Sequence, residues 1–165
     1  MGSQVRPVMP TVLAVDDDPK FLNALAEMLT AAGYGVIRAA DGVQTVDLLE
    51  KKHNEIDLII VDLALPGING FEIIGAISRR PNRLKIIATT SVYKDAHFEM
   101  AGALGAHAAI RKPPEGKPIP EREWLDTVHR LIGEPAHPMR ADAGGAPRTG
   151  KADISESKNG PETSH

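Results

Sequence analysis

The chain has no cysteine among its 165 residues. Disulfide bonds and thiolate metal sites are therefore excluded, and the absence agrees with a reducing compartment. No stretch approaches the ~18 consecutive apolar residues that a membrane-spanning helix requires, and residues 1–10 lack the apolar core of a secretion signal. We therefore expect a cytoplasmic protein that is not embedded in a membrane.

A strong excess of one charge is also missing. The formal net charge is -3 and the sequence pI is about 6.1, so the bulk charge does not indicate a nucleic-acid-binding protein, and we expect no DNA binding. Hydrophobic residues make up 42% of the chain and charged residues 25%, which is typical of a folded globular domain. The length suits one such domain better than two.

Short apolar runs that end abruptly predict strands buried on both faces of a parallel sheet. The two strongest runs are residues 11–15 and 58–61, and each is followed directly by aspartate. A third run covers residues 84–88, and weaker candidates lie at residues 36–37 and 108–110.

Helical patterns fall between these runs. Asp18 and Pro19 form a typical helix start, apolar residues repeat at helical spacing through residues 21–29, and Gly33 supplies a stop. Four further helices are predicted over residues 43–49, 71–77, 95–104 and 124–132. The alternation predicts an α/β fold in which a doubly wound parallel sheet carries helices on both faces.

The composition changes after Gly133. Residues 134–165 contain four prolines, four glycines and one large aliphatic residue, Ile154. Such a segment buries too little apolar surface to offset the entropy lost on ordering. We therefore expect an N-terminal extension (residues 1–10), one folded domain (residues 11–133) and a flexible tail (residues 134–165).

Acidic side chains follow two of the predicted strands. Asp16, Asp17 and Asp18 follow the first strand, and Asp62 follows the third. The five-stranded, flavodoxin-like form of this three-layer fold commonly has strand order 2-1-3-4-5, which makes these two strands neighbours. Carboxylates brought together at one edge repel each other unless a cation intervenes, and hard oxygen ligands suit Mg²⁺. Asp18 is better explained as a helix cap.

Four segments resemble the motifs of bacterial response-regulator receiver domains. They are residues 12–19, with the acidic pair after the first strand, residues 60–72, around the phospho-accepting aspartate, residues 86–91, at the fourth strand, and residues 105–113, which end in Lys-Pro. The segments occur in the family's order, and the resemblance covers residues 11 to about 133.

The resemblance implies a role for each acidic position. Asp62 would accept a phosphoryl group from a sensor histidine kinase or a histidine phosphotransfer protein. Asp17, Asp62 and the Ala64 carbonyl would hold Mg²⁺, for which Mn²⁺ could substitute, and Asp16 would act mainly through a metal-bound water.

It also implies partners for the phosphoryl group. Thr90 would bond one phosphoryl oxygen and Lys112 would form an ion pair with another. Thr89 is the rival of Thr90, which we prefer because its distance from Lys112 fits the family and Ser91 fills the small position that follows. The Lys112–Pro113 bond is expected to be cis, as X-Pro bonds permit.

One position departs from the family pattern. Receivers commonly carry an aromatic switch residue three positions before the lysine, where this chain has Ala109. Tyr93 resembles the loop tyrosine of an atypical receiver subset and could replace it; a half-exposed loop aromatic is the competing interpretation. If Tyr93 is the switch, Tyr93→Ala should alter partner binding and leave phosphorylation intact.

The resemblance implies a single-domain response regulator that is not an enzyme in the usual sense. It would signal through phosphorylation-dependent contacts with a protein effector, or through phosphorylation-dependent dimerisation, and not through DNA. The alternatives are a scaffold that works unphosphorylated and a Mg²⁺-dependent phosphatase of the haloacid dehalogenase type. Those phosphatases carry an Asp-x-Asp motif on the first strand and a cap domain. The chain has Asp16-Asp17-Asp18-Pro19 at that place and we expect no cap domain, which counts against this alternative.

Overall fold

A computed structural model describes residues 9–81, 84–91 and 94–136 of the chain. It contains one sheet of five parallel strands in the order β2-β1-β3-β4-β5, which confirms the predicted fold class and strand order. The elements, in chain order, are β1 (Thr11–Val15), α1 (Pro19–Ala31), β2 (Gly35–Ala39), α2 (Gly42–Lys52), β3 (Leu58–Asp62), α3 (Gly70–Ser78), β4 (Lys85–Thr90), α4 (Asp95–Leu104), β5 (Ala108–Arg111) and α5 (Glu121–Ile132).

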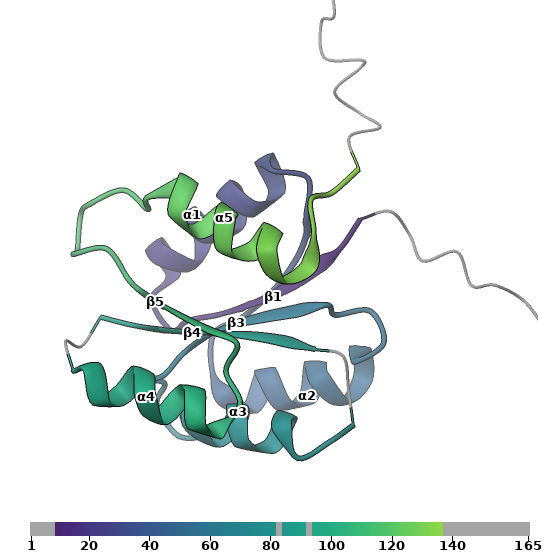
Figure 1. Ribbon diagram of the computed structural model, residues 1–165, viewed down its shortest axis with the longest axis vertical. Coiled ribbons are helices and arrows are strands. Elements are labelled where there is room, and N and C mark those ends of the chain that lie inside the picture. The colour runs from purple at the N-terminus through teal and green to yellow at the C-terminus, as the bar shows by residue number, and fades with distance from the viewer. Residues whose placement is uncertain (1–8, 82–83, 92–93, 137–165) are drawn as a thin grey trace, which may run out of the picture.

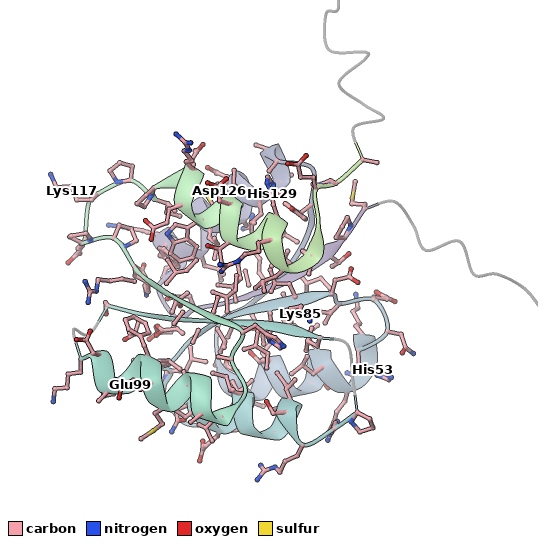
Figure 2. The ribbon with its side chains drawn as sticks, in the orientation of Figure 1. His53, Lys85, Glu99, Lys117, Asp126 and His129 are labelled. Carbon is pink, nitrogen blue, oxygen red and sulfur yellow. The ribbon has the colours of Figure 1, made fainter. Side chains whose placement is uncertain are left out.

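The sheet lies between two helical layers. Helices α1 and α5 cover one face, and α2, α3 and α4 cover the other (Figure 1). Side chains fill the space on both sides of the sheet (Figure 2) and form two apolar cores. All five residues of β3 are buried, as expected for a central strand of a doubly wound sheet.

Local capping signals determine where the helices begin. The Asp18 side chain accepts a hydrogen bond from the Lys20 N–H at the start of α1, with Pro19 as the first helical residue. Asn69 caps α3 in a reciprocal capping box with Glu72. These caps fix the ends of the two loops that follow β1 and β3, where the acidic residues lie.

In the first turn of α2, the buried residues are not the ones that the apolar pattern of the sequence indicates. Val43 is 68% exposed, whereas Thr45 is buried and its hydroxyl donates to the Asp41 carbonyl (2.7 Å). The start of the helix packs against the loop after β3 so closely that a Cβ on Gly42 would lie 2.3 Å from the Ile68 carbonyl oxygen. This contact orients Gly42 and Thr45 inward and leaves Val43 outside.

The segment after α5 is attached to the domain at its beginning. The Tyr34 hydroxyl donates to the Gly133 carbonyl (2.7 Å), and Pro135 is buried against Gly33. Packed structure thus continues at least to Pro135, two residues beyond the predicted domain end. The remaining predicted tail, residues 137–165, and residues 1–8 of the predicted extension lie outside the described residues. Within the described part, no helix has the length and apolar character of a membrane span.

Candidate functional site

Three carboxylates meet at the carboxyl ends of β1 and β3. The two strands are parallel neighbours with Val15 opposite Val61, so the residues that follow, Asp16 and Asp62, come side by side. One oxygen from each of Asp16, Asp17 and Asp62 lies within 4.8 Å of the others. Asp16 and Asp62 are buried, and Asp17 is exposed. The sequence-based prediction that these acids converge is confirmed.

The loop after β1 determines how Asp16 is oriented. Its Oδ1 accepts a hydrogen bond from the Asp18 N–H (2.9 Å), and its own N–H donates to the Ala39 carbonyl of β2 (3.2 Å). The carboxylate is therefore held inward while Asp18, the next but one residue, caps α1. Asp18 is thus a structural residue of this loop, as its position in the sequence indicated.

The loop after β3 determines how Asp62 is oriented. Its Oδ1 accepts a hydrogen bond from the Ala64 N–H (2.9 Å). The Leu63 N–H donates to the Thr89 carbonyl of β4 (2.8 Å) and so extends the sheet by one residue. A Cβ on Gly70 would lie 2.3 Å from the Asp62 carbonyl oxygen, so the start of α3 closes onto this loop as only glycine permits.

Lys112 supplies the cation of the site. Its Nζ lies 2.7 Å from Asp16 Oδ2 and 3.5 Å from Asp62 Oδ2, and its side chain is 10% exposed. The Lys112 N–H donates to the Thr90 carbonyl (3.0 Å), which holds the residue beside β4 after β5 has ended. Burial by itself would lower the pKa of Lys112, but the hydrogen bond to Asp16 and the charges of Asp62 and Asp16 outweigh it and raise that pKa.

Asp16 is held in a less favourable environment for a charge. Burial raises its pKa, and the charge of Asp62 adds to the rise; hydrogen bonds from Lys112 and from the Asp18 backbone act in the opposite direction. Its Oδ2 is buried and has Lys112 as its neighbouring cation. Two buried carboxylates beside one ammonium leave an excess of negative charge, which a divalent cation bound by Asp16, Asp17 and Asp62 would neutralise. The donor set therefore fits Mg²⁺.

The two threonines at the end of β4 are both buried, at 1% exposure each. In the strand register Thr89 stands opposite Asp62, and its hydroxyl is buried without a hydrogen bond in the described part of the protein. Thr90 is the last residue of β4, and successive strand residues point to opposite faces of the sheet. The preference for Thr90 over Thr89 as phosphoryl ligand remains a prediction.

The expectation of a cis bond before Pro113 is wrong. No described peptide bond is cis, and Lys112–Pro113 is therefore trans. Trans is preferred for X-Pro by about 0.5–1 kcal/mol. The chain turns a few residues later, where the Lys117 N–H donates to the Pro114 carbonyl (3.0 Å) and Gly116 has a φ of 77°.

The two candidate switch positions give different results. Ala109 is exposed on β5, opposite Ala88 of β4 in the strand register. Tyr93 lies outside the described residues, so its role remains a prediction. Sequence reasoning missed that Phe21 lies beside Lys112 and that Trp124 packs on Phe21. Their spacing indicated only the apolar faces of two helices, and no motif marked them.

A cavity of about 590 Å³ lies away from the carboxylates. It lies between α2 and α3 and is lined by residues such as Ile56, Asp57 and Leu84, which precede β3 and β4. The acids lie at the opposite, carboxyl ends of the strands, where doubly wound sheets place their sites. The cavity is therefore not part of the site.

Comparisons with known proteins agree with this geometry. Residues 12–122 match the model of the response regulator receiver domain family, and the chain belongs to this family. It is 36% identical over 114 residues to the transcriptional regulatory protein AfsQ1 of Streptomyces coelicolor, covering 69% of this chain and 49% of that protein. It is 33% identical over 124 residues to CpxR of Escherichia coli, covering 75% of this chain and 50% of that protein. The chain thus spans about half the length of the curated relatives it matches.

A solved structure shows the same fold. The putative response regulator of Chloroflexus aurantiacus superimposes with a TM-score of 0.68 at 28% identity, covering 76% of this chain and 99% of that one. Receiver domains are phosphoacceptor signalling modules that bind Mg²⁺ through acidic residues, and Asp16, Asp17 and Asp62 form such a cluster here.

Proposed function

We propose that Asp62 accepts a phosphoryl group from a phosphohistidine of a sensor histidine kinase or a histidine phosphotransfer protein. The observation that carries the proposal is the position of Lys112, whose ammonium lies between the buried Asp16 and Asp62 carboxylates at the edge of the sheet. Phosphoryl transfer depends on positioning and on cations that neutralise the phosphoryl charge, and here a carboxylate nucleophile lies beside an ammonium and two further acids that could hold a divalent metal ion.

The transfer forms one bond and breaks one bond. An Asp62 carboxylate oxygen attacks phosphorus, the bond from phosphorus to the donor's imidazole nitrogen breaks, and the imidazole takes the electron pair. Lys112 lies 3.5 Å from Asp62 Oδ2 and can move onto a phosphoryl oxygen as charge develops. Mg²⁺, held by Asp16, Asp17 and Asp62 with the Ala64 carbonyl, would supply further neutralisation of the phosphoryl charge. Thr90 would donate to another phosphoryl oxygen.

The output follows from the change in charge. A phosphoryl group on Asp62 adds negative charge at the end of the sheet and stabilises whichever conformation binds it better. We propose that this conformation contacts a protein effector or a second phosphorylated copy, without a DNA-binding step in residues 9–136. If Tyr93 completes the switch in place of Ala109, Tyr93→Ala should change effector affinity while phosphorylation proceeds unchanged.

The second candidate is a receiver that acts without phosphorylation, as a scaffold. Ala109 favours it, because an exposed methyl group offers no side chain that could swing inward at that place. The two candidates differ in whether an adduct forms on Asp62.

Intact-protein mass spectrometry after mixing with acetyl phosphate and Mg²⁺ tests the proposal. The wild type should gain one phosphoryl group, and Asp62→Asn should gain none. Asp18→Asn is a matched control, because asparagine caps helices as well as aspartate and Asp18 lies outside the acidic cluster. Omitting Mg²⁺ should abolish the adduct, and Mn²⁺ should restore it. If folded wild-type protein forms no adduct with acetyl phosphate or phosphoramidate, the scaffold function is favoured.

A pair of variants assigns the threonine. Thr90→Ala should slow formation of the adduct more than Thr89→Ala does. The reverse order would assign the phosphoryl ligand to Thr89, which stands opposite Asp62 in the register.

A further inference from the structure

Lys112 has an aromatic neighbour in addition to its two carboxylates. Its Nζ lies 4.7 Å from the centroid of the Phe21 ring, in the first turn of helix α1. A cation over an aromatic face is attracted by the negative charge of the ring face, and the attraction is stronger away from water. Lys112 is only 10% exposed, so the ring forms one wall of the space in which its ammonium lies.

Phe21 is in turn packed against a residue of helix α5. Its ring and that of Trp124 are 5.7 Å apart and inclined by 60°, in an edge-to-face arrangement. Such contacts depend on relative orientation, because the positive edge of one ring meets the negative face of the other. A continuous row of contacts therefore leads from Asp62 through Lys112 and Phe21 to Trp124.

Trp124 is held by packing and not by a polar anchor. It is fully buried, and its indole N–H has no hydrogen bond within the described part of the protein. Buried indole N–H groups usually find a partner. No hydrogen bond therefore resists a small change in the orientation of the Trp124 ring.

We propose that Phe21 is a positioning residue for Lys112, and that the Phe21–Trp124 pair transmits the movement of this ammonium to helix α5. The proposal rests on phosphorylation of Asp62. In the unphosphorylated protein, Lys112 Nζ lies 2.7 Å from Asp16. A phosphoryl group on Asp62 draws Lys112 away from Asp16. The ammonium then changes its place over Phe21, and the edge-to-face contact with Trp124 adjusts.

Tryptophan fluorescence tests the proposal directly, because the chain contains a single tryptophan. Emission is recorded while acetyl phosphate and Mg²⁺ are added, and the adduct is quantified by intact mass in the same samples. The expected result is a change in Trp124 emission that rises in proportion to the adduct and is absent in Asp62→Asn. Phe21→Leu should lose this change and take up the phosphoryl group about fivefold more slowly, because it lacks the ring that positions the cation.

Two variants separate positioning from simple packing. Phe21→Tyr restores an aromatic face and should restore both the rate and the emission change. Phe71→Leu removes a partly buried ring that packs on His97, on the opposite face of the sheet, and should behave as the wild type. Urea unfolding monitored by circular dichroism identifies any variant that does not fold. If Phe21→Leu does not fold, the test is decided by comparing the Trp124 emission change of the wild type with that of Asp62→Asn.

The outcomes are distinguishable. If the adduct forms while Trp124 emission stays constant, or if Phe21→Leu keeps the wild-type rate and emission change, the positioning role is overturned and the phosphorylation of Asp62 stands. If no adduct forms with either donor, the proposed function fails and the inference fails with it.

Discussion

Lys112 is bonded more closely to Asp16 than to Asp62. Its Nζ lies 2.7 Å from an Asp16 oxygen and 3.5 Å from an Asp62 oxygen. Lys112 thus pairs mainly with Asp16, and its longer contact with Asp62, the proposed nucleophile, is the weaker one. Both acids are buried, and the Lys112 ammonium is the cation that lies beside them.

Removing the ammonium should destabilise the fold. Lys112→Met leaves two buried carboxylates without their cation, and we expect the free energy of unfolding at pH 7 without Mg²⁺ to fall by about 3 kcal/mol. Urea unfolding measures the loss. Lys117→Met, at an exposed lysine of the neighbouring loop, should change it little. Adding Asp16→Asn to Lys112→Met should recover part of the loss, because one of the unpaired charges is then removed. Equal stability of Lys112→Met and the wild type would contradict this.

A methyl group at Gly70 should distort the loop that carries Asp62. The added Cβ would lie 2.3 Å from the Asp62 carbonyl oxygen and 2.7 Å from Leu63 Cα, both backbone atoms. We expect Gly70→Ala to lose about 2 kcal/mol of stability and to slow adduct formation. Gly75→Ala, in the same helix, meets nothing nearer than 3.9 Å and should be neutral or stabilising by up to about 1 kcal/mol. Thermal unfolding of the two variants compares them, and similar losses would argue against a special role for Gly70.

His107 should make stability depend on pH. Its Nδ1 accepts a hydrogen bond from the Ile86 N–H (3.1 Å) at the start of β4, so the ring must be neutral at that nitrogen. Burial, and then the charge of Lys85, lower the pKa of His107 below 6.5. Because the folded state binds the proton less readily than the unfolded state, neutral His107 contributes to the free energy of unfolding. This contribution is complete above pH 6.5 and is lost as pH falls through the lower pKa of the folded state.

The comparison variant is His107→Asn, which keeps an acceptor and does not titrate in this range. Between pH 7 and pH 5 the wild type should lose more stability in urea than this variant does. The difference should stay below about 1 kcal/mol, because the His107 ring is largely exposed and protonation breaks one hydrogen bond, that from the Ile86 N–H. Parallel pH profiles of the two proteins would contradict the role of His107.

Tyr34 should anchor the segment that follows α5. Its hydroxyl donates to the Gly133 carbonyl (2.7 Å), and His129 packs on its ring at 5.8 Å between centroids; His129 projects from α5 in Figure 2. Tyr34→Phe should cost about 1 kcal/mol in urea unfolding at pH 7, since the part-buried hydrogen bond to the Gly133 carbonyl is lost. Burial, and then the charge of Glu134, raise the pKa of Tyr34 to about 12.

The raised pKa gives a second readout for the same residue. The protonated phenol is favoured in the folded state, so its contribution is present below pH 10 and is lost as pH rises through about 12. Absorbance of tyrosinate in the wild type minus that in Tyr34→Phe should therefore rise only above about pH 11. Ionisation of Tyr34 near pH 10 would contradict the buried contact.

The fold class and most of the candidate site could be predicted from the order of residues alone. Residues 58–61 are apolar throughout because both faces of a central strand are covered, and this pattern can be recognised without a structure. The caps Asp18 and Asn69 act through hydrogen bonds to residues two or three positions away. The proximity of Asp16 and Asp62 could be predicted because parallel neighbouring strands end at the same edge of the sheet.

Contacts between residues that are distant in the sequence could not be predicted in this way. The exposure of Val43 follows from the contact of Gly42 with Ile68. The closer bond of Lys112 to Asp16, and its contact with Phe21, join three segments that no local pattern relates. Packing between separate elements determines such contacts, whereas hydrophobic periodicity and capping operate within a few residues of one segment.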